Sequence, residues 1–254
     1  MRLLEAAHVS VRYGEADALR DAGFTLDAGE WLMVTGPNGA GKSTLLNAVA
    51  QSLPSQGTIT YRGREVRSMK PRERARYIGV LAQSYAVGYA FTVEEVVRLG
   101  RYAYAPHVFS RKSGDDGEYV AAALAMVGLD GMRDKPVTAL SGGELQRVFL
   151  AQVLAQDPAI LLLDEPSSHL DLKFQKELFE LLQDWLKGEG RAVISVVHDI
   201  GLAKAYGTRA LLLKNGRMLA CGGTEEVLSR ERLAEAFELD VYAWMRGLGR
   251  QWEE

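Results

Sequence analysis

The stretch Gly36-Pro37-Asn38-Gly39-Ala40-Gly41-Lys42-Ser43 constrains this chain more than any other. It fits the pattern G-x-x-x-x-G-K-[ST], in which glycines let the backbone curl around an anion so that successive N–H groups point inward. An apolar run over residues 31–34 precedes the loop, and a helical pattern over residues 44–50 follows it. A strand, a phosphate-binding loop and a helix in this order predict a nucleotide-binding unit of an α/β fold.

The residue types in this loop suit a polyphosphate with a bound cation. Lys42 is placed to reach the outer phosphates, and the hydroxyl of Ser43 can ligate Mg2+, which prefers oxygen ligands and shares phosphate oxygens. We therefore expect ATP and Mg2+ as cofactors. The loop residues expected to bind the nucleotide are Asn38, Gly39, Gly41, Lys42, Ser43 and Thr44.

Composition excludes several classes of protein. The chain has 254 residues, of which 47% are hydrophobic and 25% charged, so it can bury one large core or a core and a smaller lobe. The net charge of -3 gives no reason to expect nucleic acid as a partner. The longest apolar runs, residues 159–163 and 192–197, are far shorter than the roughly 18 residues of a membrane span. Residues 1–5 lack a signal-peptide core and Cys221 has no second cysteine to pair with, so we expect a reducing cytoplasm.

A second group of candidate residues follows two predicted buried strands. Asp164 and Glu165 come directly after the apolar residues 160–163, and His198 comes after residues 192–197. Ligands bind at the carboxyl ends of parallel strands, where Asp164 can hold Mg2+ and Glu165 can orient or deprotonate a water. Paired acids at such an end can also simply cap the next helix. His198 can likewise be a cap or, beside Glu165, a donor to the γ-phosphate.

Two further features leave alternatives open. Ser141, Gly142 and Gly143 stand immediately before a predicted helix that ends at Ala155, so they form either an ordinary cap or a second phosphate-binding terminus. Tyr13 follows a predicted strand and can stack on an adenine base or serve as a turn tyrosine.

The middle of the chain differs in character from its flanks. Residues 85–156 are more helical in pattern, with one helix expected over residues 93–101, which fits a helical lobe inserted between the strands of an α/β core. Tyr85, Tyr89 and Phe91 stand at the start of this stretch. They can pack beneath their loop or form a docking surface for a partner, and both interpretations stay open.

Taken in order, these motifs resemble those of the ATP-binding subunits of ABC transporters, from about Leu3 to at least Tyr242. The matching elements are the phosphate loop at residues 36–43, the Q-loop glutamine Gln83, the L-S-G-G-Q-type signature at residues 140–146 with Glu144 where glutamine is commoner, the Walker B aspartate Asp164, the catalytic glutamate Glu165, the D-loop at residues 168–171 and the switch histidine His198. Tyr13 falls at the family's adenine-stacking position.

The resemblance implies a single ABC ATPase domain over residues 1–254, with a P-loop NTPase core of α/β class. Residues 1–84 and 157–254 would form a RecA-like core that includes an antiparallel N-terminal β part and C-terminal helices. Residues 85–156 would form the inserted helical lobe.

The resemblance also implies roles for individual residues. Those implied in catalysis are Glu165, His198, Gln83 and Lys42, and those implied in holding Mg2+ are Ser43, Gln83 and Asp164. Ser141, Gly142 and Gly143 would bind the nucleotide of a second copy of the chain, in an ATP-dependent head-to-tail dimer with two equivalent sites.

Within the family, three stretches resemble importers of iron-siderophores, haem and cobalamin: residues 91–101, 163–175 and 222–239. This implies an ATPase that powers uptake of a metal chelate through two separate transmembrane permease subunits and, indirectly, works with a substrate-binding protein. It would lie peripherally on the cytoplasmic face of the inner membrane. An alternative is a soluble ABC ATPase that acts as an assembly or scaffold factor, for example in iron-sulfur cluster assembly.

Overall fold

The computed structural model describes residues 1–83, 90–104, 116–168 and 170–252, and the loop aromatics Tyr85 and Tyr89 lie outside these ranges. The strands are β1 Arg2–Tyr13, β2 Ala16–Asp27, β3 Trp31–Thr35, β4 Gln56–Tyr61, β5 Arg64–Glu65, β6 Ile78–Leu81, β7 Ile160–Asp164, β8 Ala192–Val196, β9 Arg209–Lys214 and β10 Arg217–Gly223. The α-helices are α1 Lys42–Val49, α2 Pro71–Ala75, α3 Val93–Arg98, α4 Asp116–Met126, α5 Gly142–Ala155, α6 Leu172–Leu186, α7 Ile200–Tyr206, α8 Thr224–Val227, α9 Arg230–Phe237 and α10 Val241–Gly249. Short 3-10 turns are η1 Val66–Ser68, η2 Leu99–Tyr104, η3 Asp130–Met132, η4 Val137–Ala139 and η5 Arg250–Trp252.

The strands form one sheet in the order β5-β4-β1-β2-β10-β9-β3-β8-β7-β6. The strands β9, β3, β8, β7 and β6 run parallel, as expected for a nucleotide-binding core. At the other end, β2, β1, β4 and β5 pair antiparallel, which confirms the predicted N-terminal antiparallel part. The hairpin of β9 and β10 joins the two regions through a parallel bridge between β10 and β2.

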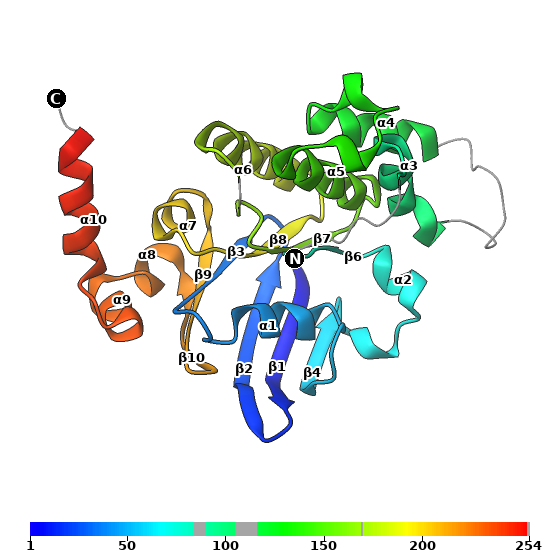
Figure 1. Cartoon of the computed structure of the whole chain (residues 1–254). Coiled ribbons are helices and arrows are strands. Elements are labelled where there is room, and N and C mark those ends of the chain that lie inside the picture. The colour runs from blue at the N-terminus through cyan, green and yellow to red at the C-terminus, as the bar shows by residue number, and fades with distance from the viewer. Residues whose placement is uncertain (84–89, 105–115, 169, 253–254) are drawn as a thin grey trace.

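The central strands are apolar on both faces because helices or other strands cover both. In β3, Trp31 and Met33 belong to one buried cluster, and Leu32 and Val34 belong to the other. Figure 1 shows α5 and α6 above the strands and α1 below them, next to the N-terminal β part. A parallel strand covered on both sides has no need of alternating polarity, which explains the continuous apolar runs in the sequence.

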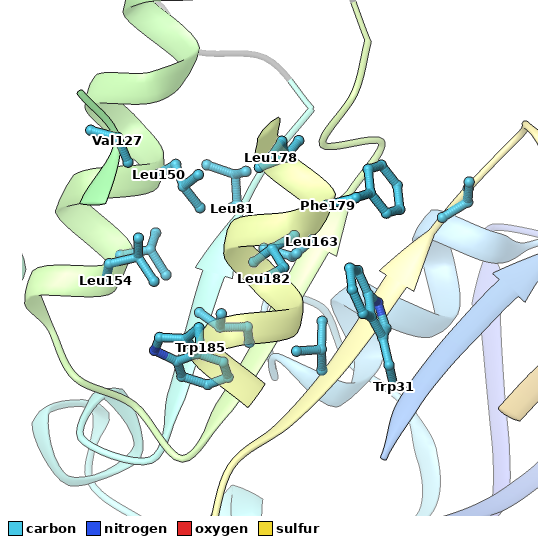
Figure 2. Packing of buried hydrophobic residues seen from close by; sticks show 14 of the residues in the cluster. Trp31, Leu81, Val127, Leu150, Leu154, Leu163, Leu178, Phe179, Leu182 and Trp185 are labelled. Carbon is cyan, nitrogen blue, oxygen red and sulfur yellow. The ribbon is translucent and has the colours of Figure 1, made fainter. Parts of the chain in front are cut away.

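Helix α6 carries the stripe that packs on the upper face. Its buried residues Leu178, Phe179, Leu182 and Trp185 recur at helical spacing, and Asp171 caps the first turn by accepting from the Phe174 N–H at 2.9 Å. Figure 2 shows these side chains directed at the strands. The ring of Phe179 stacks on Trp31, with centroids 5.4 Å apart. Trp31 in turn donates its indole N–H to Ser195 Oγ at 2.8 Å, so the buried ring has its polar partner.

The helix expected over residues 93–101 ends sooner than the pattern suggests. It ends at Arg98 and the chain continues as the 3-10 turn η2. Gly100 lies so close to α5 that an added Cβ would stand 2.1 Å from the carbonyl oxygen of Gln152. The buried Arg101 pairs with Asp116 at 2.9 Å. Packing between distant segments therefore tightens the backbone here, against the local helical pattern.

The end of the chain holds an element that the sequence pattern did not lead us to expect. Residues 241–249 form α10, which stands away from the rest of the molecule in Figure 1, and η5 follows it. Over the described ranges, no helix has both the length and the apolar character needed to cross a membrane.

Candidate functional site

The phosphate loop takes a shape that only glycine allows at two positions. Gly36 has a φ of 144°, and an added Cβ would lie 2.1 Å from the Leu213 carbonyl oxygen. Gly41, which caps α1, has a φ of 98°, and its added Cβ would lie 2.6 Å from the Ala18 carbonyl oxygen. Both residues combine a left-handed backbone with close approach to a neighbouring strand or hairpin. These two glycines therefore fix the path of the loop that leads into α1.

Lys42 lies at the base of the loop. Its side chain is buried, and the ammonium donates to the carbonyl oxygens of Gly36 at 2.8 Å and Pro37 at 2.9 Å. Burial lowers the pKa of Lys42, against the opposing effect of the Glu165 and Asp164 carboxylates. The loop thus surrounds the Lys42 ammonium, and two of the three N–H donors of that group are bound to loop carbonyls.

A hydrogen bond between Ser43 and Asp164 joins the phosphate loop to the end of β7. The Ser43 hydroxyl, in the first turn of α1, donates to Asp164 Oδ1, at the end of β7, at 2.9 Å. Desolvation raises the pKa of Asp164, and the hydrogen bond from Ser43 offsets only part of that effect. A buried, poorly solvated carboxylate next to a hydroxyl offers two oxygen ligands to a hard divalent cation.

The Glu165 carboxylate is hydrogen-bonded by three side chains from separate parts of the chain. His198 Nε2 lies 2.6 Å from Glu165 Oε1, while Gln83 Nε2 and Ser168 Oγ donate to Oε2 at 2.9 and 3.0 Å. Partial burial would raise the pKa of Glu165, but the hydrogen bonds from His198 and Ser168, with Gln83, outweigh burial and hold it below its ordinary value. Its backbone has a φ of 50°, a left-handed conformation uncommon for glutamate. The carboxylate is thus ionised and fixed in direction.

These groups surround one cleft of about 600 Å³. Its lining consists of Ala18, Asn38, Gly39, Gly41, Lys42, Ser43, Thr44, Gln83, Glu165 and His198. Asp164 is not among the lining residues, but it accepts a hydrogen bond from the lining residue Ser43. Tyr13 is 56% exposed at the end of β1 and is not among the lining residues, so its stacking on a base stays a prediction.

Two residues of this site were assigned no role at it from the sequence, although Ser168 belongs to the D-loop segment at residues 168–171. Ala18, on β2, lines the cleft, and Ser168 holds Glu165. The position of Ser168, three residues after Glu165, was an available signal, because its N–H also closes a turn onto the Glu165 carbonyl at 3.1 Å. Ala18 gave no such signal, because β2 reaches the loop only through the fold.

The signature residues are not part of this cleft. Ser141 caps α5: its Oγ accepts from the Glu144 N–H at 3.3 Å, and Glu144 Oε2 accepts from the Ser141 N–H at 2.7 Å and from its hydroxyl at 2.8 Å. The backbone and side-chain bonds from Ser141 lower the pKa of Glu144. The glutamate at this position therefore completes a capping box. Ser141, Gly142 and Gly143 do not line the cleft that holds Lys42.

Comparison with known proteins identifies the family. The family model described as "ABC transporter" matches residues 19–168. A curated relative, the hemin import ATP-binding protein HmuV of Bradyrhizobium diazoefficiens, is 41% identical, over 94% of this chain and 90% of its own length.

Solved structures agree. An inward-facing ABC transporter described as metal-chelate type matches with a TM-score of 0.81 and 28% identity, covering 94% of this chain and 89% of that chain. A bacterial ABC transporter cassette solved as a dimer matches with a TM-score of 0.78 and 27% identity, covering 87% of this chain and 99% of that chain. With its phosphate loop, its Asp164-Glu165 pair and its sheet order, the chain belongs to the ABC transporter family, as an ATP-binding cassette that hydrolyses ATP.

Proposed function

We propose that this cassette powers the import of a metal chelate such as haem, through a membrane permease formed by other chains. The observation that carries the ATPase half of the proposal is the Glu165 carboxylate, fixed by Gln83, Ser168 and His198 at the cleft that contains Lys42. The transport half is supported by the hemin import relative and by the metal-chelate type transporter. Siderophore and cobalamin complexes belong to the same proposed substrate class.

In the proposed reaction, Glu165 orients the attacking water and accepts its proton. Its position is suited to this role because it is ionised yet held by three donors, so it cannot swing away. His198 keeps the carboxylate in place and, from the same cleft, can donate to the γ-phosphate. Lys42 binds the outer phosphates by exchanging its bonds to the loop carbonyls for bonds to phosphate oxygens.

The same proposal assigns Mg2+ to Ser43 and Asp164, with Gln83 at the outer edge. The burial of Asp164, which disfavours its anion, would be offset by a divalent cation that its carboxylate helps to hold. The NH2 group of Gln83 is committed to Glu165, so the amide oxygen is the atom it has for a cation. When bound, Mg2+ would neutralise charge on the phosphates and help to orient them.

We also propose that two copies share each ATP. The signature residues Ser141, Gly142 and Gly143 do not line the cleft of their own chain, and a cassette with 27% identity has been solved as a dimer. A head-to-tail pair would bring each signature to the other copy's γ-phosphate. In this arrangement residues 1–84 and 157–254 act as the core and residues 85–156 as the lobe that delivers the signature, while the permease and the inner membrane lie on the side of that lobe.

Reconstitution tests the proposed function. The chain would be co-expressed with the permease encoded beside it, and the complex would be placed in proteoliposomes together with the substrate-binding protein. Haem, a ferric siderophore and cobalamin would then be supplied in turn. We expect ATP-dependent uptake of one of them, lost in Glu165→Gln. If no permease associates with the chain and it purifies instead in a soluble complex with unchanged ATPase activity, the assembly or scaffold factor replaces the importer.

A further inference from the structure

The turn that follows Glu165 is held by hydrogen bonds from several sides. The Glu165 N–H donates to the Val196 carbonyl at 3.2 Å, and the Ser168 N–H closes the turn on the Glu165 carbonyl at 3.1 Å. Gln175 of α6 donates through Nε2 to the Leu170 carbonyl at 3.0 Å. Glu165 itself has a left-handed φ of 50°, which a glutamate keeps only where its surroundings impose it. The direction of its carboxylate therefore depends on how this turn is anchored.

Gln146, on α5, supplies one more anchor to this turn. Its side-chain NH2 group donates to the Pro166 carbonyl at 2.5 Å. Pro166 has no N–H, so this carbonyl is the only backbone group through which it can form a hydrogen bond. The bond from Gln146 therefore ties the residue directly after Glu165 to α5.

The side chain of Gln146 does not reach the ATP cleft. It is not among the residues that line that cleft, and it lines instead a separate cavity of about 270 Å³ together with Pro166, Leu150 of α5 and Leu178 of α6. Although Gln146 ends the signature stretch of residues 140–146, its side chain bonds to the backbone of its own chain. An effect of Gln146 on the reaction must then pass through that backbone to Glu165.

A purely structural bond is the simpler interpretation, because α5 has to be attached to the core. That attachment is already made at the other end of the helix, where Gln156 donates through Nε2 to the Ile78 carbonyl at 3.0 Å. Gln146, by contrast, lies about 6 Å along the helix axis from Gly142, the first residue of α5. A displacement of the first turn of α5 would thus act directly on the turn that carries the carboxylate.

We propose that Gln146 is a positioning residue for ATP hydrolysis: its hydrogen bond to the Pro166 carbonyl fixes the turn that aims the Glu165 carboxylate into the cleft. The proposal rests on the role of Glu165 in the proposed function and adds to it the route by which α5 acts on that residue. Without the bond, the carboxylate keeps its three side-chain partners, but the backbone that carries it loses its anchor to α5. The water that Glu165 orients is then misplaced, so the chemical step slows while ATP binding does not change.

The test is Gln146→Met, which keeps the length of the side chain and removes its donor. Gln152→Met, further along the same helix, is the matched control, because Gln152 lines neither the cleft nor the cavity. We expect phosphate release at saturating ATP to fall about 10 to 100-fold in Gln146→Met and to stay within about two-fold in the control. Affinity for a non-hydrolysable ATP analogue should stay within about two-fold in both, and thermal unfolding checks that both are folded.

A double-mutant cycle separates positioning from a loss of stability. If Gln146 acts through Glu165, then Gln146→Met should change the residual rate of Glu165→Gln, measured in single turnover, by less than about two-fold. Gln146→Lys keeps an N–H donor, and the neighbouring cavity has room for its longer chain. This variant should therefore retain at least about a third of the parent rate.

Three results would overturn the proposal: Gln146→Met at near the parent rate, an equal loss from Gln146→Met in both backgrounds, or Gln146→Lys as slow as Gln146→Met. Each of these leaves the role of Glu165 intact. A failure of the proposed function looks different, because Glu165→Gln alone would then keep the parent rate, and the role of Gln146 would fall with it.

Discussion

Replacing Glu165 by glutamine should lower the rate of ATP hydrolysis while leaving the stability of the fold nearly unchanged. Glutamine has the same shape, and its carbonyl oxygen can keep the bonds from Gln83 and Ser168, which both reach Oε2. Its NH2 group then faces His198, which can accept through Nε2 by changing its tautomer. All three partners stay satisfied, so we expect the free energy of unfolding to change by less than about 1 kcal/mol.

The loss in rate should be much larger. A positioned general base contributes about 10² to 10⁴-fold, which corresponds to an increase of about 3 to 5 kcal/mol in the activation free energy. We expect turnover, measured as phosphate release at saturating ATP, to fall by that factor while ATP affinity stays within about three-fold. Glu180→Gln is the matched control, because Glu180 lies on the exposed side of α6 and pairs there with Lys176 at 3.5 Å. A Glu165→Gln enzyme that turns over at near the parent rate would refute the role of this carboxylate.

Three further changes test the fold and the loop. Phe179→Ala deletes a fully buried ring stacked on Trp31 and should lower the free energy of unfolding by about 3 to 5 kcal/mol, as measured by urea unfolding. Gly36→Ala places a Cβ 2.1 Å from the Leu213 carbonyl oxygen, so ATP binding should be lost in a calorimetric titration, and normal affinity would show that the loop can relax. Asp164→Asn should abolish Mg2+-dependent hydrolysis yet stabilise the fold at neutral pH, because burial raises the pKa of Asp164 and its ionisation therefore costs stability as pH rises. That gain should shrink as pH falls through the raised pKa of Asp164 toward the ordinary aspartate value of 3.8 and be absent below it, and a gain independent of pH would contradict this cause.

The parts of the fold that the sequence predicts are those coded by local patterns. The strand Trp31–Thr35 lies where the apolar run of residues 31–34 predicts one, because that run is followed closely by the first glycine of the loop. Asp164, Glu165 and His198 meet in space because each follows a buried strand, and parallel neighbouring strands end at the same edge of the sheet.

The parts that were missed depend on contacts between distant segments. The 3-10 turn after Arg98 results from the approach of Gly100 to α5, which no local propensity encodes. Ala18 lines the cleft only because the long hairpin of β1 and β2 folds against the loop. Helix α10 is a different case: its apolar spacing was present in the sequence, but the exposure of Trp244 and Leu248 along it is visible only in the structure.

The central claim, that each ATP is bound and hydrolysed between two copies of the chain, is tested most directly by mixing two inactive variants. Ser141→Arg blocks the signature and Lys42→Ala disables the phosphate loop, so a mixed dimer has one site with both lesions and one with neither. At equal amounts, half of the dimers are mixed and half of their sites are intact, so ATPase activity should recover to about a quarter of the parent value. A mixture whose activity is only the mean of the two variants measured separately would contradict the shared site, as would a Ser141→Arg monomer that hydrolyses ATP at the parent rate.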